Sequence, residues 1–158
     1  MFDTILGLPV HALVVHFVVV LVPLSALGVI GIAVVPAWRE RFGLAVLALA
    51  TVALVSVPVA VLSGQKLRNR VNASGITGDQ IDQHMKMGKL VIYPTAAMWV
   101  LAALLFWFDR KGRGGGATKV VLILSVVAAL AAAAQVSITG HLGSTAVWSC
   151  TLQTSACK

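Results

Sequence analysis

Histidine is the residue type with the widest chemical repertoire in this 158-residue chain, which contains four of them. His11 and His16 lie in an apolar segment near the N-terminus. His84 precedes a third apolar segment and His141 follows a fourth. Neutral imidazole binds haem iron and transition metals. Since no paired carboxylates, Ser-His-Asp arrangement or zinc-type cysteine spacing accompanies them, the sequence favours ligation of a cofactor or metal and leaves open whether the chain is an enzyme.

The spacing of the first two histidines predicts that they face different neighbours. Residues five apart on a helix differ by about 140° around the axis and 7.5 Å along it, so His11 and His16 do not easily share one ion. His16 is expected roughly 10 Å below the membrane boundary, where ionisable side chains usually face the bundle interior. Gln135 lies at a similar depth in the fourth apolar segment and is expected to hydrogen-bond His16.

The leading hypothesis is a b-type haem protein of membrane electron transfer, working with a redox partner or a membrane complex. The axial ligands would be His16 with either His141 or His84, because haem in a helical bundle accepts imidazoles from opposite helices. His11 would be a ligand at a second site or a partner of a propionate. The basic residues expected at the same level, and so able to pair with propionates, are Lys66, Arg68, Lys86 and Lys89.

Two other hypotheses account for the same residues. In the first, the protein is a non-catalytic membrane subunit or scaffold, and an uncharged His16 joins two helices through Gln135. In the second, the chain binds or transports a transition metal, such as copper, zinc or nickel, through His16, His84 and His141.

The composition indicates a membrane protein. Hydrophobic residues make up 59% of the chain and charged residues 11%, and the mean hydropathy is +0.96. Soluble domains carry roughly 25% charged residues, and a soluble protein of this size could not bury so much apolar surface. Four apolar runs approach or exceed the ~20 residues that span a bilayer, at 10–35, 42–62, 89–108 and 119–140. Such uninterrupted runs predict an all-α bundle of four transmembrane helices forming one domain over residues 1–158.

The basic residues predict how the chain is oriented. The formal net charge is +7, and the basic residues lie in short segments between the apolar runs. This pattern is typical of topology control and of contact with anionic lipid headgroups, not of nucleic-acid binding. The segments 36–41 and 109–119 are short and rich in Lys and Arg, so both are expected in the cytoplasm. Both termini and the 63–88 segment would then lie outside, in a multi-pass protein of the cell's inner (plasma) membrane.

The segment between the second and third apolar runs carries a helix-start signal. Thr77 and Gln80 fit a capping box. Asp79 and Asp82 would follow in the first turn, where the helix dipole favours negative charge. We therefore expect the third helix to begin near Gly78 and to project above the membrane before entering it.

Prolines and cysteines suggest further local features. Pro23, Pro58 and Pro94 lie within apolar runs and predict kinks. Cys150 and Cys157 enclose a short C-terminal loop on the side expected to be oxidising, where a disulfide would form. No internal repeat is apparent in the residue identities.

The segment 7–17, Gly-Leu-Pro-Val-His-Ala-Leu-Val-Val-His-Phe, resembles the opening signature of a bacterial membrane family catalogued as domain of unknown function 2231. That signature typically reads His-Pro, a few apolar residues, then His-Phe-Pro. His84 matches a further histidine before the third helix, and residues 139–144 resemble a Gly-rich motif near the end of the fourth. Ala12 and Val18 stand where the family commonly has proline.

The resemblance covers nearly the whole chain and implies a four-helix membrane protein. The family name supplies no function. Some relatives are fused to, or lie beside, cytochrome c-type modules, which by analogy favours the haem or electron-transfer hypothesis.

Overall fold

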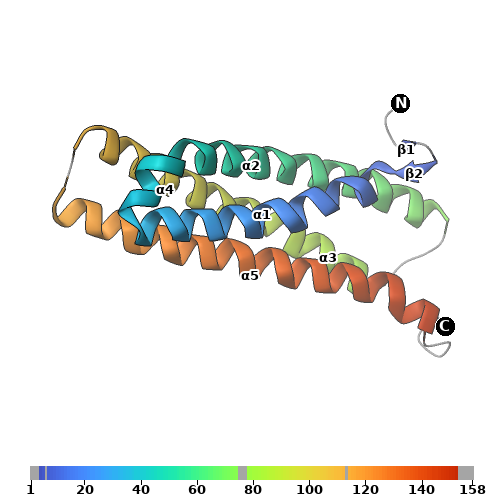
Figure 1. Cartoon of the computed structure of the whole chain (residues 1–158). Coiled ribbons are helices and arrows are strands. Elements are labelled where there is room, and N and C mark those ends of the chain that lie inside the picture. Colours follow the sequence, from blue (N-terminus) through green and yellow to red (C-terminus); the bar gives the residue numbers. More distant parts are fainter. Residues whose placement is uncertain (1–3, 6, 75–77, 113, 153–158) are drawn as a thin grey trace.

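The computed structural model is almost entirely helical and describes residues 4–5, 7–74, 78–112 and 114–152, with side chains described as far as residue 148. Two short strands pair at the N-terminus, and five helices follow them (Figure 1). The elements are β1 (Thr4–Ile5), β2 (Leu8–Pro9), α1 (Val10–Val34), α2 (Pro36–Ala73), α3 (Asp79–Leu90), α4 (Ile92–Arg110) and α5 (Gly116–Leu152).

Four helical segments are long and apolar enough to cross a membrane: α1, α2, the α3–α4 pair and α5. The 25 residues of α1 extend about 37 Å, which exceeds the ~30 Å hydrocarbon core. The prediction of an all-α bundle with four spans is confirmed. The helices are longer than the predicted apolar runs, since α2 continues to Ala73 and α5 to Leu152. Hydropathy marks only the part of a helix inside lipid, and the polar ends stay helical beyond it.

The four spans form a closed ring. α1 packs against α2 and α5, and α4 packs against the same two helices, whereas α1 and α4 lie diagonally opposite and touch little. α3 rests mainly on α5. The two termini lie at one end of the bundle, and the α4–α5 connection lies at the other (Figure 1). We call the first of these the histidine end, because all four histidines lie in that half of the bundle.

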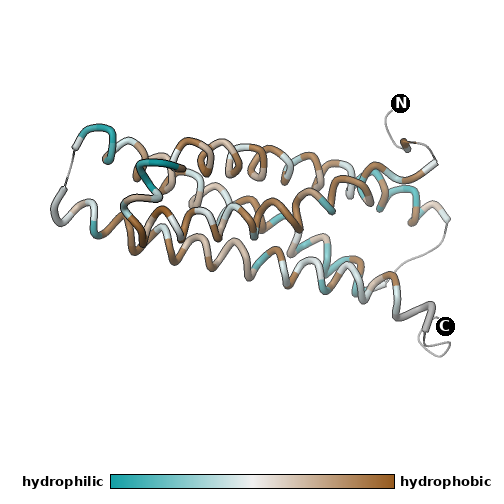
Figure 2. Tube along the Cα trace, in the orientation of Figure 1, coloured by the Kyte–Doolittle hydropathy of each residue, from teal (hydrophilic) through white to brown (hydrophobic). Residues whose placement is uncertain are grey.

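The outer surface of the bundle suits lipid. Figure 2 shows hydrophobic residues along the middle of the helices and hydrophilic residues gathered towards both ends. Large apolar side chains point outward, including Leu27 at 67% exposure and Ile123 at 65%. A soluble protein rarely leaves so extended an apolar surface uncovered, whereas in a bilayer that surface is solvated by lipid tails. The core is built from small and β-branched residues, which let the helices approach closely.

Burial along the chain repeats between the two halves of the bundle. Five buried residues of α1 each have a buried counterpart 73 residues later in the chain. The counterpart of Val18 is Val91, and the other four counterparts lie in α4. Four buried positions of α2 recur in α5 at a constant spacing of 79 residues, as from Ala50 to Ala129. The corresponding pairs are 18/91, 22/95, 25/98, 29/102 and 32/105, followed by 50/129, 53/132, 57/136 and 60/139.

The bundle is therefore two similar hairpins packed side by side. We call α1–α2 the first hairpin and α3–α5 the second hairpin. The ring order, in which α1 and α4 occupy equivalent corners and α2 and α5 the other two, agrees with an approximate two-fold axis along the bundle. Sequence analysis found no repeat because the repeated property is burial. Ser25, for example, corresponds to Met98, and both are fully buried.

The start of α3 lies where the sequence predicted it. The helix begins at Asp79 with Gly78 as N-cap, and Asp79 and Asp82 lie in its first turn. No side-chain hydrogen bond caps it in the structure. Thr77 lies outside the described residues, so the predicted capping box stays a prediction.

Two of the three prolines lie inside helices. Pro23 is within α1 and Pro58 within α2. Pro94 is instead in the first turn of α4, after the interruption at Val91 that separates α3 from α4. Proline is tolerated there because the first-turn N–H groups have no intrahelical acceptor. The predicted disulfide involves Cys157, which lies outside the described residues, and the side chain of Cys150, which does as well.

A candidate cofactor site between two histidines

The rings of His11 and His84 meet at the histidine end. Their centroids are 6.2 Å apart and the ring planes are inclined at 73°. His11 is the second residue of α1, and His84 lies in the middle of α3, so each hairpin contributes one ring. Both side chains are partly buried. The two residues are 73 positions apart, the same spacing as the buried residues around them, so they are equivalent in the repeat.

Each histidine is oriented by a backbone carbonyl of its own hairpin. His11 Nδ1–H donates to the Ala60 carbonyl at 3.0 Å. His84 Nδ1–H donates to the Thr139 carbonyl at 2.9 Å. Because a carbonyl oxygen only accepts, Nδ1 carries the hydrogen and Nε2 of each neutral ring keeps its lone pair. Histidines that bind metals are commonly held in this way, with the second ring nitrogen bonded to a carbonyl or carboxylate.

A glycine lies under each ring. A Cβ at Gly64 would stand 2.9 Å from His11 Cε1, and a Cβ at Gly143 would stand 2.9 Å from His84 Cε1. Real Cβ atoms are essentially never so close to another heavy atom, so only glycine lets the imidazole rest on the neighbouring helix. Each glycine is one turn beyond the carbonyl that accepts from the same histidine, and the two glycines are again 79 residues apart.

His16 and His141 do not join this pair. His16 is exposed on the outside of the bundle, and its Nδ1–H donates to the Ala12 carbonyl of its own helix. His141 is exposed on α5. Among the residues that the structure describes, no group of three or more His, Cys, Asp or Glu side chains could hold a metal ion. The predicted set of His16, His84 and His141 is therefore not assembled in one chain.

The expected bond between His16 and Gln135 is absent from this structure. Gln135 Nε2–H donates to the Met87 carbonyl at 3.1 Å, which links α5 to α3. His16 lies about 200° around α1 from the buried Val18, so core packing turns it outward. The expectation that His16 faces the bundle interior is therefore wrong, because its side chain is exposed.

Basic side chains of α2 lie near the histidine end, two of them beside His11. Arg68 Nη2–H donates to Asp82 Oδ1 at 2.6 Å and ties α2 to α3, with 14% of the Arg68 side chain exposed. Lys66 and Arg70 line a cavity of about 10 Å³ beside His11, enough for one water molecule.

The two lysines predicted to bind the cofactor lie on α3. Lys86 and Lys89 are both exposed there, close in sequence to His84. Their contribution to the site stays a prediction.

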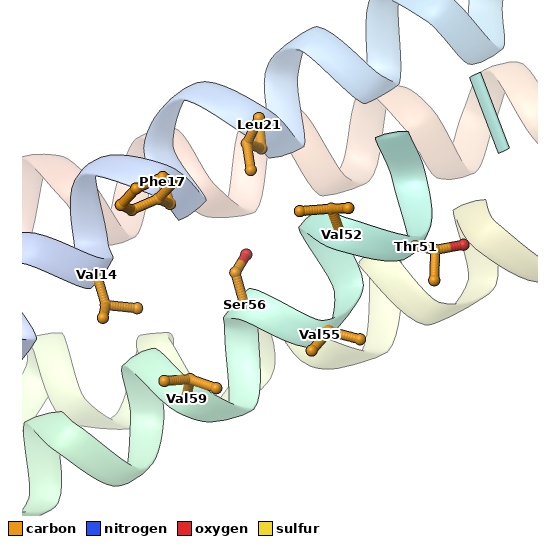
Figure 3. Close-up of a pocket in the computed structure, with 8 residues that line it drawn as sticks. All are labelled: Val14, Phe17, Leu21, Thr51, Val52, Val55, Ser56 and Val59. Carbon is orange, nitrogen blue, oxygen red and sulfur yellow. The ribbon is translucent and has the colours of Figure 1, made fainter. Parts of the chain in front are cut away.

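A groove on the outside of the first hairpin is separate from this site. It has a volume of about 360 Å³ and lies between α1 and α2, where it is lined by apolar side chains and two hydroxyls (Figure 3). Both hydroxyls are bonded within the protein, Ser56 to the Ala53 carbonyl and Thr51 to the Leu47 carbonyl. Trp99 Nε1–H also donates to Thr51 Oγ1. A lipid tail matches such a lining.

Four long apolar helices, a lipid-compatible surface and a core of small residues define an integral membrane protein with a four-helix bundle. The chain belongs to the predicted membrane protein family of domain of unknown function 2231, whose family model matches residues 7–156. The resemblance seen in the first helix is thereby confirmed. Comparison with curated proteins and with solved structures gives no match.

The sequence predicts both members of the central pair as candidate ligands but favours His16 for the ligand role. The sequence gives no signal for Gly64 beyond its position inside a helix, and it marks Gly143 only as part of the Gly-rich motif at 139–144. A glycine inside a helix costs about 1 kcal/mol relative to alanine, so an interior glycine such as Gly64 is a signal for close packing that could have been used.

Proposed function

We propose that this protein binds one b-type haem between its two hairpins, with His11 and His84 as axial ligands, and that it transfers electrons in the membrane. The proposal is carried by the His11–His84 pair, whose ring centroids are 6.2 Å apart. The backbone carbonyls bond Nδ1 of each ring, so the Nε2 lone pair of each is left to bind iron. Metal–imidazole bonds are about 2.0–2.1 Å long and the nitrogen lies about 1.1 Å from the ring centre, so two imidazoles on opposite sides of one ion have centroids roughly 6.3 Å apart.

The number of ligands favours haem over a bare metal ion. Structural and catalytic zinc sites use three or four protein ligands, and no group of that size exists among the described residues. Haem brings four nitrogens of its own, so two axial histidines complete the coordination. His11 and His84 form a sufficient ligand set for haem and an insufficient one for a closed zinc site. Haem held in this way supplies one-electron transfer between ferric and ferrous iron.

A flat cofactor needs an opening between the two hairpins at the histidine pair. The two rings belong to different hairpins, and α2 touches α3 only sparsely, whereas α3 rests firmly on α5. The cavity beside His11 holds about one water molecule. Binding therefore requires the first hairpin and α3 to move apart at this end, where they make few mutual contacts.

The orientation expected from the basic residues would put the proposed site on the outer side of the membrane. At the other end of the bundle, Arg39 and Arg41 lie in the first turns of α2, and Arg110 and Lys111 lie at the end of α4. Positively charged short loops favour the cytoplasm. A haem at the histidine end would then exchange electrons with a partner outside the cytoplasm.

The test is a redox difference spectrum of the full chain, purified after expression with a haem supply and also titrated with haemin in detergent. We expect low-spin bands from one haem per chain. His11→Ala and His84→Ala should each remove those bands, while the exposed His16→Ala and His141→Ala serve as matched controls and should keep them. A colourless protein that binds no haemin contradicts the proposal, and stoichiometric copper, zinc or nickel in such a protein would support the metal-binding alternative.

A further inference from the structure

The two-fold relation of the hairpins is broken at Arg68. Arg68 lies one turn beyond Gly64 on α2, and the equivalent position on α5, one turn beyond Gly143, is Val147. On the facing elements, Asp82 of α3 corresponds to Pro9, just before α1. The first and second hairpins thus present the same histidine and the same glycine, but only the α2–α3 edge carries a guanidinium group.

Only one of the two terminal nitrogens of the Arg68 guanidinium has a hydrogen-bond partner among the described residues. Its side chain is 14% exposed, and Nη2 donates to Asp82 Oδ1 at 2.6 Å. Nη1 is buried and has no hydrogen-bond partner within the described part of the chain. Asp82 is itself half exposed, with 52% of its side chain accessible. A buried, charged N–H group normally has an acceptor, so Arg68 is set to receive a second anionic group.

The surrounding charge is predominantly positive. Residues 63–90 contain five basic residues, three on α2 and two on α3, against only Asp79 and Asp82. Two of the five, Lys66 and Arg70, lie beside His11 around the small cavity. The field at this edge is positive and favours a carboxylate.

We infer that Arg68 binds a carboxylate of the cofactor through Nη1, and that it thereby fixes which edge of the site receives the acidic side of the haem. This inference rests on the proposed function. A site with two equivalent histidines and two equivalent glycines cannot by itself distinguish the edges of a porphyrin. Arginine presents a planar fork of donors that suits carboxylates, and Val147 on the opposite edge offers no such group.

The experiment compares haemin with its dimethyl ester, in which both carboxylates are blocked, by titrating each into the full-length protein in detergent. The wild-type protein should prefer haemin by roughly tenfold or more, as expected for a charge-assisted hydrogen bond. Arg68→Gln should bind the two ligands with similar affinity. Arg41→Gln removes the same charge from an exposed arginine at the opposite end of the bundle and should keep the preference.

Two further variants keep the result decisive if Arg68→Gln folds poorly. Arg68→Lys retains the charge without the fork and should keep only part of the preference. Asp82→Asn removes the present partner of Arg68 and should maintain or increase the preference for haemin.

The outcomes separate this inference from the proposed function. If the wild-type protein binds haemin and the ester equally well with low-spin spectra, the role of Arg68 is refuted while the haem site stands. A preference that survives in Arg68→Gln refutes it as well. If neither ligand binds, the proposed function fails and the assignment of Arg68 fails with it.

Discussion

Gly64 and Gly143 stand in the same relation to the two histidines, since a Cβ on either would lie 2.9 Å from the Cε1 atom of its imidazole. Each glycine also follows by one turn the carbonyl that orients the same ring. Each hairpin therefore positions one ring of the His11–His84 pair in the same way, with a carbonyl and a glycine of its second long helix. The haem proposal explains why both ligand-type side chains are held so closely.

Replacing either glycine with alanine should displace its histidine. The added Cβ must push the ring away from the helix, because the opposing atoms belong to an imidazole ring that is held by a backbone carbonyl. We expect Gly64→Ala and Gly143→Ala to weaken haemin binding by roughly tenfold or more and to cost about 1–3 kcal/mol of stability through overpacking. Haemin titration and thermal unfolding in detergent measure the two effects.

Gly140→Ala is the matched control for these variants. It lies on the same helix as Gly143, and its Cβ would make an ordinary contact of 3.9 Å with Val19. We expect unchanged haemin affinity and equal or higher stability, because alanine is the better helix former. Normal binding in both Gly64→Ala and Gly143→Ala would show that the rings do not need their present positions.

Arg39 should stabilise the end of the bundle opposite the histidines without affecting the site. It is 8% exposed, and its Nε–H donates to the Ile32 carbonyl in the last turn of α1 at 3.0 Å. Arg39→Ala should cost about 1.5–3 kcal/mol, as for a hydrogen bond from a charged group. Unfolding followed by helical circular dichroism measures this. Arg41→Ala, which removes an exposed side chain stacked on Phe42, should cost less than about 1 kcal/mol.

His16 and Gln135 should be energetically independent. Gln135 bonds to the Met87 carbonyl and His16 bonds within its own helix, so neither depends on the other. In a double-mutant cycle of His16→Ala and Gln135→Ala, the stability changes should add within about 0.5 kcal/mol. A coupling of 1 kcal/mol or more would restore the contact that sequence analysis expected between them.

The fold was predictable from hydropathy because a bilayer imposes a single requirement, that backbone groups be bonded within the segment. The α1 span and the start of α3 near Gly78 follow from that requirement and from local helix signals. The true length of α2 was not predictable in the same way. Its last turns, with Arg68 and Arg70, are polar and leave the apolar window, yet they carry the arginine that pairs with Asp82 of α3.

The site was predictable in its residue types and not in its pairing. All four histidines were identified, but choosing a pair requires the rotation of each helix. Depth favoured His16 over His11, whereas packing of Val18 and Val22 into the core turns His16 outward. The carbonyls of Ala60 and Thr139 carry no signature in the sequence, because every residue has one. The repeat in burial was also hidden, since the two hairpins share few residue identities.

The predicted orientation can be tested by cysteine labelling in intact cells. Cys150 and Cys157 are first replaced with serine, and a single cysteine is then placed at Gly114 or at Asn72. A thiol reagent that does not cross membranes should label the Asn72 position and not the Gly114 position, because the basic α4–α5 connection is expected inside. The reverse pattern would place the histidine end in the cytoplasm.

The most direct test of the central claim is rescue by free imidazole. His84→Gly removes one proposed ligand and leaves space for an imidazole molecule beside Thr139. We predict that the haemin-titrated variant lacks the low-spin spectrum of the wild-type protein, regains it on addition of imidazole, and does not regain it when His11 is also replaced. A low-spin spectrum in His84→Gly without imidazole, or equally in the variant lacking both histidines, would contradict ligation of one iron by His11 and His84.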